Sequence, residues 1–185
     1  MQSHKTPLLL HVCCAPCSPY IIDLLSTHYD VTLYFYNPNI HPSEEYLLRV
    51  EETRRLADDL SLECIIGDDH TDLWFSLVKG LETEPEKGKR CEVCFHMRLK
   101  SAFDKARQLS IPLITTTLTV SPHKHAPTIN FIGEQLEREY DGIRFLSENF
   151  KKHDGFRKTN EMGKKYNFYR QNYCGCVYSM RKQAT

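Results

Sequence analysis

The sequence predicts an α/β fold in which a mainly parallel β-sheet carries helices on both faces, a Rossmann-like arrangement. Short apolar or β-branched runs alternate along the chain with segments whose apolar residues recur at helical spacing. Clusters of Asn, Asp, Gly and Pro separate these segments. The chain has 185 residues, of which 41% are apolar, so it can bury a sizeable core, and we expect a single α/β domain over residues 1–185.

The first strand is expected at Leu8–Val12, a short apolar run. The loop that follows, residues 13–19, is rich in cysteine and proline. Residues 20–27 have apolar side chains at helical spacing and predict the first helix. The second strand, residues 31–36, is β-branched and aromatic, and an Asn-Pro-Asn turn ends it.

The middle of the chain continues this alternation. Ser43 followed by two glutamates predicts the start of a helix that runs to about Leu60. Residues 61–66 form a short third strand that ends at a glycine. Residues 73–78 are predicted to be helical, and the polar residues 80–89 are predicted to form a loop.

Cys91 begins the next predicted helix, and the apolar and threonine-rich residues 112–119 give the clearest later strand. A helix follows at residues 126–140 and a last strand at 143–146. From about residue 149, Lys, Asn, Gly and Tyr replace aliphatic residues, so we expect a basic and aromatic C-terminal segment with little core to bury.

The fold predicts where chemistry takes place. Ligands bind beyond the carboxyl ends of the strands in parallel α/β sheets. The loop that contains Cys13, Cys14 and Cys17 lies beyond one such end, and residues 119–125 lie beyond another. The sequence therefore predicts a cysteine-rich site at the carboxyl ends of the strands.

Charge and composition exclude some classes of protein. Lys plus Arg and Asp plus Glu number 24 each, so the net charge does not indicate a polyanionic partner, although a local basic patch remains compatible with one. No apolar run is long enough to span a bilayer, and the N-terminal stretch does not resemble a secretory signal. We expect a cytoplasmic protein without a membrane partner, in which eight cysteines indicate metal binding or redox catalysis.

Two groups of cysteines predict a metal site. Cys13, Cys14 and Cys17 lie in one tight loop, and Cys91 and Cys94 form a C-x-x-C pair at a predicted helix N-terminus, where thiolates are favoured. A C-x-x-C alone also suits half a zinc site or a thioredoxin-like redox pair. Together with Cys13 and Cys14 it completes four thiolates, which suit zinc or an iron–sulfur cluster. Adjacent cysteines make a poor zinc knuckle, so the spacing favours the cluster.

Cys174-Gly-Cys176 forms a third group. Glycine between two cysteines allows a strained disulfide ring, and strained disulfides are the labile, catalytic kind. Two further metal ligands are the alternative. Cys64 is isolated in an apolar strand and is interpreted as a core residue.

Three motifs in a fixed order are similar to those of a known family. They are His11-Val-Cys-Cys-Ala-Pro-Cys-Ser18, Arg90-Cys-Glu-Val-Cys-Phe-His-Met-Arg98 and Tyr173-Cys-Gly-Cys176. Their combination resembles the QueH-type epoxyqueuosine reductases, and residues 34–41 and 115–125 resemble these proteins too. The similarity extends from about Leu8 to Met180, and it is the combination of motifs, rather than any one of them, that is specific.

The resemblance implies the last step of queuosine formation, in which the epoxide oxygen of epoxyqueuosine is removed at the wobble base of a tRNA anticodon. It implies that Cys13, Cys14, Cys91 and Cys94 bind a 4Fe-4S cluster. It also implies that Cys174 and Cys176 form a redox-active disulfide. The expected partners are a tRNA carrying epoxyqueuosine and an external electron donor.

The resemblance further implies an additional mononuclear iron beside the cluster, bound in part by a residue of the first loop. Cys17 is the candidate ligand of that iron. Some members of the family carry Asp where this chain has Cys17, so a thiolate replaces a carboxylate in the expected coordination.

The reaction also needs a proton source, for which the candidates are three histidines, and a surface for tRNA. Basic stretches with interleaved aromatic residues near the C-terminus suit an unpaired base that is stacked and held. The candidate substrate-binding residues are His11, His123, His125, Arg170 and Tyr173. The alternative function is a zinc–thiolate RNA-binding module without redox activity. A nucleotide-binding transferase is disfavoured because neither glycine-rich phosphate-binding motif occurs.

Overall fold

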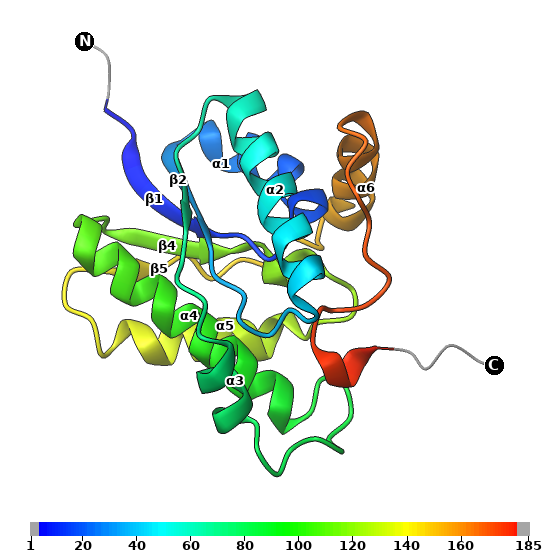
Figure 1. Ribbon diagram of the computed structural model, residues 1–185. Coiled ribbons are helices and arrows are strands. Elements are labelled where there is room, and N and C mark those ends of the chain that lie inside the picture. The colour runs from blue at the N-terminus through cyan, green and yellow to red at the C-terminus, as the bar shows by residue number, and fades with distance from the viewer. Residues whose placement is uncertain (1–3, 181–185) are drawn as a thin grey trace.

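A five-stranded parallel sheet forms the centre of the computed structural model, which describes residues 4–180 (Figure 1). The strand order is β3-β2-β1-β4-β5. The strands are β1 (Thr6–His11), β2 (Tyr29–Phe35), β3 (Cys64–Ile66), β4 (Leu113–Thr116) and β5 (Arg144–Phe145). Leu10 of β1 pairs with Leu33 of β2 on one side and with Thr115 of β4 on the other. The strand order reverses between β1 and β4, and loops beyond such a point open a crevice for ligands.

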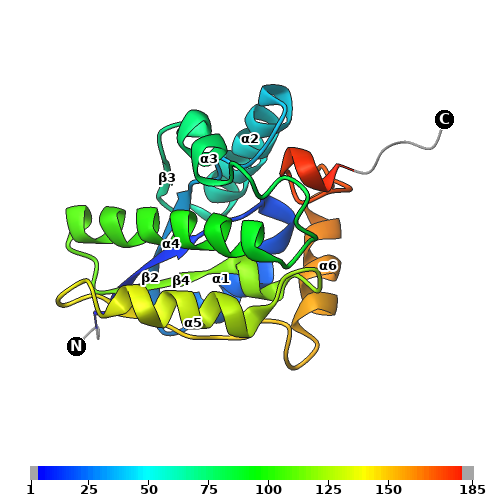
Figure 2. The same ribbon diagram turned by 90° about the horizontal axis from the view of Figure 1, so that it is seen from below.

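Helices cover both faces of the sheet, as the sequence predicts. They are α1 (Pro19–Ser26), α2 (Ser43–Leu60), α3 (Thr71–Leu77), α4 (Lys89–Leu109), α5 (Ala126–Glu137) and α6 (Gly155–Lys165). Figure 2 looks onto α4 and α5, which pack side by side. Within residues 4–180, no helix is both long and apolar enough to cross a membrane.

The alternation of side chains along β1 produces two cores. Leu8 and Leu10 pack in a cluster with residues of α1 and α2, whereas Leu9 packs in a cluster with residues of α4 and α5. All three leucines are fully buried, because a parallel strand that is covered on both faces has no side open to water. This buried central strand, paired on both edges, carries the first cysteine loop at its carboxyl end.

The strand predicted at residues 112–119 is shorter in the structure. It ends at Thr116, and residues Thr117–Val120 form a 3-10 turn. The side chain of Thr116 accepts a hydrogen bond from the backbone N–H of Leu118 at 3.1 Å and so caps the turn. The backbone N–H of Cys13 donates to Thr117 Oγ1 at 3.0 Å, which ties the turn to the cysteine loop. β-branched residues favour a strand, but these side-chain hydrogen bonds end it early.

The prediction that the segment from residue 149 has little core to bury is wrong. This segment contains α6, which packs against α1 and against the 3-10 turn Ala15–Cys17. Phe150 and Phe168 are buried in the cluster formed with α1 and α2. Phe150 and Phe168 lie on either side of the helix, and the helix itself has only Phe156 and Met162 as large apolar residues, so the helical spacing is weak in the sequence.

Candidate metal centre

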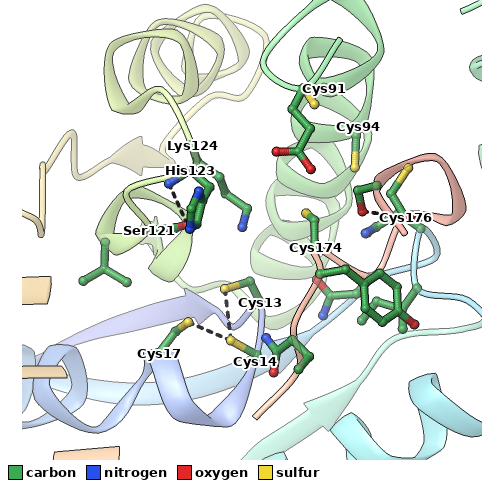
Figure 3. Close-up of a pocket in the computed structure, with 18 of the residues that line it drawn as sticks. Cys13, Cys14, Cys17, Cys91, Cys94, Ser121, His123, Lys124, Cys174 and Cys176 are labelled. Carbon is green, nitrogen blue, oxygen red and sulfur yellow. Dashed lines mark hydrogen bonds between the residues drawn. The ribbon is translucent and has the colours of Figure 1, made fainter. Parts of the chain in front are cut away.

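One cavity, with a volume of about 270 Å³, brings together seven of the eight cysteines (Figure 3). They come from three segments: the loop after β1, the first two turns of α4, and the turn near the C-terminus. The seven are Cys13, Cys14, Cys17, Cys91, Cys94, Cys174 and Cys176. Cys64 lies on β3 and does not line this cavity, in agreement with its interpretation as a packing residue. The site lies at the carboxyl ends of the strands, as the sequence predicts.

The first loop forms a compact group of sulfurs. The Sγ atoms of Cys13, Cys14 and Cys17 all lie within 4.8 Å of one another, and those of Cys14 and Cys17 are 2.7 Å apart. The Thr117 hydroxyl donates to Cys13 Sγ at 3.3 Å. Hydrogen bonds from Cys14 and then Cys17 hold the pKa of Cys13 well below its usual range. Hydrogen bonds with Cys13 and then with Cys14 raise the pKa of Cys17. Cys13 is therefore the thiol of this loop that ionises most readily.

The second group lies at the start of α4, where the sequence predicts it. Cys91 and Cys94 face the cavity one turn apart, and the backbone N–H of Lys87 donates to Cys91 Sγ at 3.3 Å. Burial raises the pKa of the Cys94 thiol to about 11 and also raises the pKa of Cys91. At Cys91, burial outweighs the hydrogen bond from the Lys87 backbone, which lowers the pKa. A metal ion that replaces the protons would keep these sulfurs as thiolates in the buried site.

Hydrogen bonds from Arg49 of α2 and from His41, just before that helix, hold the backbone of the third group. Arg49 donates to the carbonyl oxygens of Cys174 and Tyr173, and the N–H of His41 donates to that of Gly175 at 2.8 Å. Gly175 has φ +105°, and an added Cβ would lie 2.8 Å from Ile40 Cγ1, so only glycine fits here without strain. Cys174 and Cys176 are free thiols in the structure.

Buried donors on the cavity wall fit a cluster bound by thiolates. Three residues that line the cavity each have a buried N–H group without a hydrogen-bond partner within residues 4–180, namely Nε1 of Trp74 and Nε of Arg90 and Arg98. All three residues are 3% exposed or less. Sulfides and thiolates of an iron–sulfur cluster accept such hydrogen bonds, and the two guanidinium groups offset their negative charge. The donor set of the chain therefore suits a metal–sulfur group in this cavity.

Lys124 is a residue of the cavity wall that the sequence analysis did not single out. It lies in the loop before α5 and extends into the cavity toward Cys13 and Cys174 (Figure 3). Burial by itself lowers the pKa of Lys124, but the negative charge of Cys174, Cys13 and Cys17 outweighs burial and raises it. The only signal for Lys124 in the sequence is its place in the loop 119–125, which is predicted to lie beyond the carboxyl end of a strand. No motif spacing marks this lysine.

The predicted substrate-binding residues divide into two sets. His123, Arg170 and Tyr173 line the cavity. His11 does not line the cavity, because it is fully buried. Its Nδ1 lies 2.9 Å from Thr116 Oγ1, and its Nε2 donates to the carbonyl oxygen of Tyr36 at 3.1 Å. Burial, and then the charge of Arg98, lower the pKa of His11 to about 3, so it stays neutral. His125 points elsewhere, with Nδ1 2.8 Å from Thr128 Oγ1, and lines a separate groove along α4 and α5.

The fold has a relative among solved structures. A U34-tRNA thiolase, NcsA, from Methanococcus maripaludis, described with its [4Fe-4S] cluster, superimposes with a TM-score of 0.60 over 97% of this chain. The chain spans 63% of the thiolase, and the two sequences are 11% identical. At this identity the likeness shows a shared fold.

Sequence comparisons identify the family. Curated proteins named epoxyqueuosine reductase QueH are 42% identical over 94% of the chain in Haemophilus influenzae and 43% identical over 98% of it in Acinetobacter baylyi. The chain covers 71% and 84% of these relatives, respectively. The family model for epoxyqueuosine reductase QueH matches residues 8–182. The chain therefore belongs to the epoxyqueuosine reductase QueH family and is an oxidoreductase.

Proposed function

We propose that this chain reduces epoxyqueuosine to queuosine at the wobble position of a tRNA anticodon, the last step of queuosine biosynthesis. Membership of the family supports a reduction in queuosine biosynthesis. The convergence of seven cysteines from three distant segments on one cavity is the observation that carries the proposal, because a packing role does not require it. Reduction of an epoxide needs a pair of electrons, and a site that combines a metal–thiolate group with a pair of redox-active thiols could deliver them.

We assign Cys13, Cys14, Cys91 and Cys94 as the ligands of a 4Fe-4S cluster. When bound, the cluster would supply electrons one at a time and a Lewis-acidic iron. The chain itself holds the thiolates in place: Thr117 donates to Cys13, and the backbone of Lys87 donates to Cys91. The unpartnered N–H groups of Trp74, Arg90 and Arg98 are available to stabilise the negative charge that the cluster carries.

Cys174 and Cys176 complete the electron balance of the reaction. Removal of the oxygen breaks both C–O bonds of the epoxide, forms a C=C bond and releases water, which requires a pair of electrons and a pair of protons. Oxidation of the Cys174 and Cys176 thiols to a disulfide releases a pair of electrons and a pair of protons. An external electron donor then reduces the disulfide, and a strained ring favours this step. Cys174 lies close enough to Cys91 and Cys94 for its charge to raise their pKa values.

Cys17 is our candidate ligand for an additional mononuclear iron. Its Sγ lies within 4.8 Å of the sulfurs of both Cys13 and Cys14, so one ion can contact all three. A thiolate at this position would give a softer ligand set than a carboxylate would. We expect iron in excess of the cluster iron in the wild-type protein and its loss in Cys17→Ala.

The rim of the cavity suits a nucleoside that leaves an RNA loop. Phe156 on α6 is 42% exposed at the rim and offers a ring for base stacking. Arg170 is fixed to α6 by hydrogen bonds to Oδ1 and O of Asn160 at 3.1 and 3.0 Å. Together with His123 and Tyr173 it would contact the flipped nucleoside or its phosphates. A tRNA substrate also agrees with the cytoplasmic location that we propose.

Anaerobic purification followed by iron, sulfide and zinc analysis tests the proposal, together with an assay on tRNA that carries epoxyqueuosine. We expect equal amounts of iron and sulfide in the cluster, iron beyond that amount from the additional ion, a brown protein, and conversion of the epoxide with a chemical reductant such as dithionite. One zinc ion without sulfide, and no conversion, would instead indicate the zinc–thiolate RNA-binding module.

A further inference from the structure

Hydrogen bonds to its backbone fix Lys124 at the wall of the cavity. Its N–H donates to the carbonyl oxygen of Ser121 at 3.2 Å, and its own carbonyl oxygen accepts from Lys151 Nζ at 2.8 Å. The side chain is half-buried and extends toward Cys13 and Cys174 (Figure 3). The loop therefore fixes the start of a long side chain while its ammonium reaches the space where a substrate would bind.

Each of the other buried cations of the wall donates hydrogen bonds to the protein. Arg49 bonds to Glu45 and to two backbone carbonyls, and Arg90 Nη1 donates to three carbonyl oxygens at 2.6 to 2.9 Å. Arg98 donates to Oδ1 of Asn37. The ammonium of Lys124, by contrast, forms no hydrogen bond within the described residues 4–180. It is thus a half-buried donor that points into the cavity and is available to a ligand.

The reaction requires a donor of this kind. When a C–O bond of the epoxide breaks, negative charge develops on the oxygen, and a fixed cation in a partly buried site stabilises such charge strongly. Of the histidines considered for this role, His11 has both ring nitrogens engaged and His125 lies on another surface. His123 lines the cavity but is exposed to solvent. Lys124 is better placed, because its side chain extends toward Cys13 of the first cysteine group and Cys174 of the third.

We propose that the ammonium of Lys124 binds the epoxide oxygen of the substrate and is a catalytic residue of the reduction. This role rests on the proposed function. As both C–O bonds break and the electron pair from the reduced site forms the alkene, Lys124 donates a proton to the oxygen, solvent donates the other, and the oxygen leaves as water. Solvent then returns a proton to Lys124. The electrons come from the Cys174 and Cys176 thiols, as described above.

A binding experiment without reductant tests the contact directly. Epoxyqueuosine and queuosine tRNA differ by one oxygen, so their affinity ratio for the oxidised holoenzyme reports what contacts that oxygen. We expect the wild-type protein to bind epoxyqueuosine tRNA about tenfold to a hundredfold more tightly than queuosine tRNA, the range for a hydrogen bond from a charged group. In Lys124→Met and Lys124→Gln the ratio should fall to near one, and in Lys124→Arg it should be intermediate. A wild-type ratio retained in both neutral variants overturns the assignment.

Turnover provides the second measurement, with iron and sulfide content as the check on folding. Lys124→Met should retain its cluster and lose about a hundredfold in kcat, whereas Lys89→Met should keep wild-type turnover. Lys89 is an exposed lysine at the start of α4 that does not line the cavity, so it controls for loss of charge. Wild-type turnover in a neutral Lys124 variant overturns the role of Lys124 and leaves the proposed function intact. Absence of turnover in the wild-type holoenzyme overturns both.

Discussion

Arg49 on α2 donates a hydrogen bond from Nη1 to the backbone carbonyl of Cys174, at 3.2 Å, although 125 positions separate the two in sequence. The same guanidinium lies 5.5 Å from the centre of the Tyr173 ring, and its Nε is 2.7 Å from Oε1 of Glu45. Glu45 in turn accepts from the hydroxyl of Tyr169 at 2.9 Å. A buried ion pair on one helix therefore holds the turn that contains the C-terminal cysteines.

Arg49→Met should destabilise the protein by about 3–5 kcal/mol, because it leaves the buried carboxylate of Glu45 without its cation. Arg55 provides a matched control on the same helix. It pairs with Glu52 at 2.8 Å, donates to the carbonyl of Tyr166 and lies over Phe168, but its side chain is 41% exposed. Arg55→Met should cost about 1 kcal/mol or less. Urea denaturation measures both losses, and equal losses would contradict this account of the Arg49 pair.

Gly175→Ala tests whether the Cys-Gly-Cys turn needs glycine. The residue has φ +105°, and a Cβ would lie 2.8 Å from Ile40 Cγ1 and 3.0 Å from Arg49 Nη1. Gly142 also has a positive φ, +76°, but a Cβ added there would have nothing within 4 Å, so Gly142→Ala measures the backbone cost alone. We expect about 1 kcal/mol for Gly142→Ala and a clearly larger loss for Gly175→Ala, accompanied by slower turnover. Thermal unfolding gives the comparison, and similar shifts in Tm would show that the turn has room for a side chain.

The sequence predicts the parallel sheet because the strands are apolar runs between turn residues, and this pattern depends only on local order. It predicts the site for the same reason. Cys13 follows a strand and Cys91 lies at the start of a helix, and the fold brings these two positions together. Arg49 and Lys124 could not be found in this way. Arg49 acts on backbone carbonyls that any sequence provides, and Lys124 reaches the cavity through a loop whose path depends on hydrogen bonds with Ser121 and Lys151.

His11 and α6 are two further features whose surroundings could not be predicted from the sequence. His11 precedes the cysteine loop directly, and its position in the sequence does not reveal that the hydroxyl of Thr116 and the carbonyl of Tyr36 occupy its ring nitrogens. The segment that contains α6 has few aliphatic residues, so its composition resembles a solvated tail. It instead buries Phe150 and Phe168 against distant helices, which only the tertiary fold can specify.

The assignment of the cluster ligands predicts a sharp difference between cysteines. Cys13→Ala or Cys91→Ala should remove the cluster and abolish activity, since each removes one of four thiolates from a site at the end of a strand or helix. Cys64→Ala should retain the cluster, because Cys64 is half-buried on β3 outside the cavity. Iron and sulfide analysis of the anaerobically purified variants measures this. Cluster iron retained in the Cys13 or Cys91 variant would defeat the ligand assignment.

Cys176→Ser should separate the cluster from the disulfide. Cys176 lines the cavity on a turn fixed to α2, and serine keeps its size while removing the thiol that would pair with Cys174. Iron and sulfide should match the wild-type values, yet turnover with the external donor should stop. Thiol titration sharpens the test: one turnover without donor should consume a pair of thiols in the wild-type protein and in the Cys64→Ala control, but none in Cys176→Ser. Full turnover in Cys176→Ser would remove the pair from the mechanism and require the cluster alone to deliver both electrons.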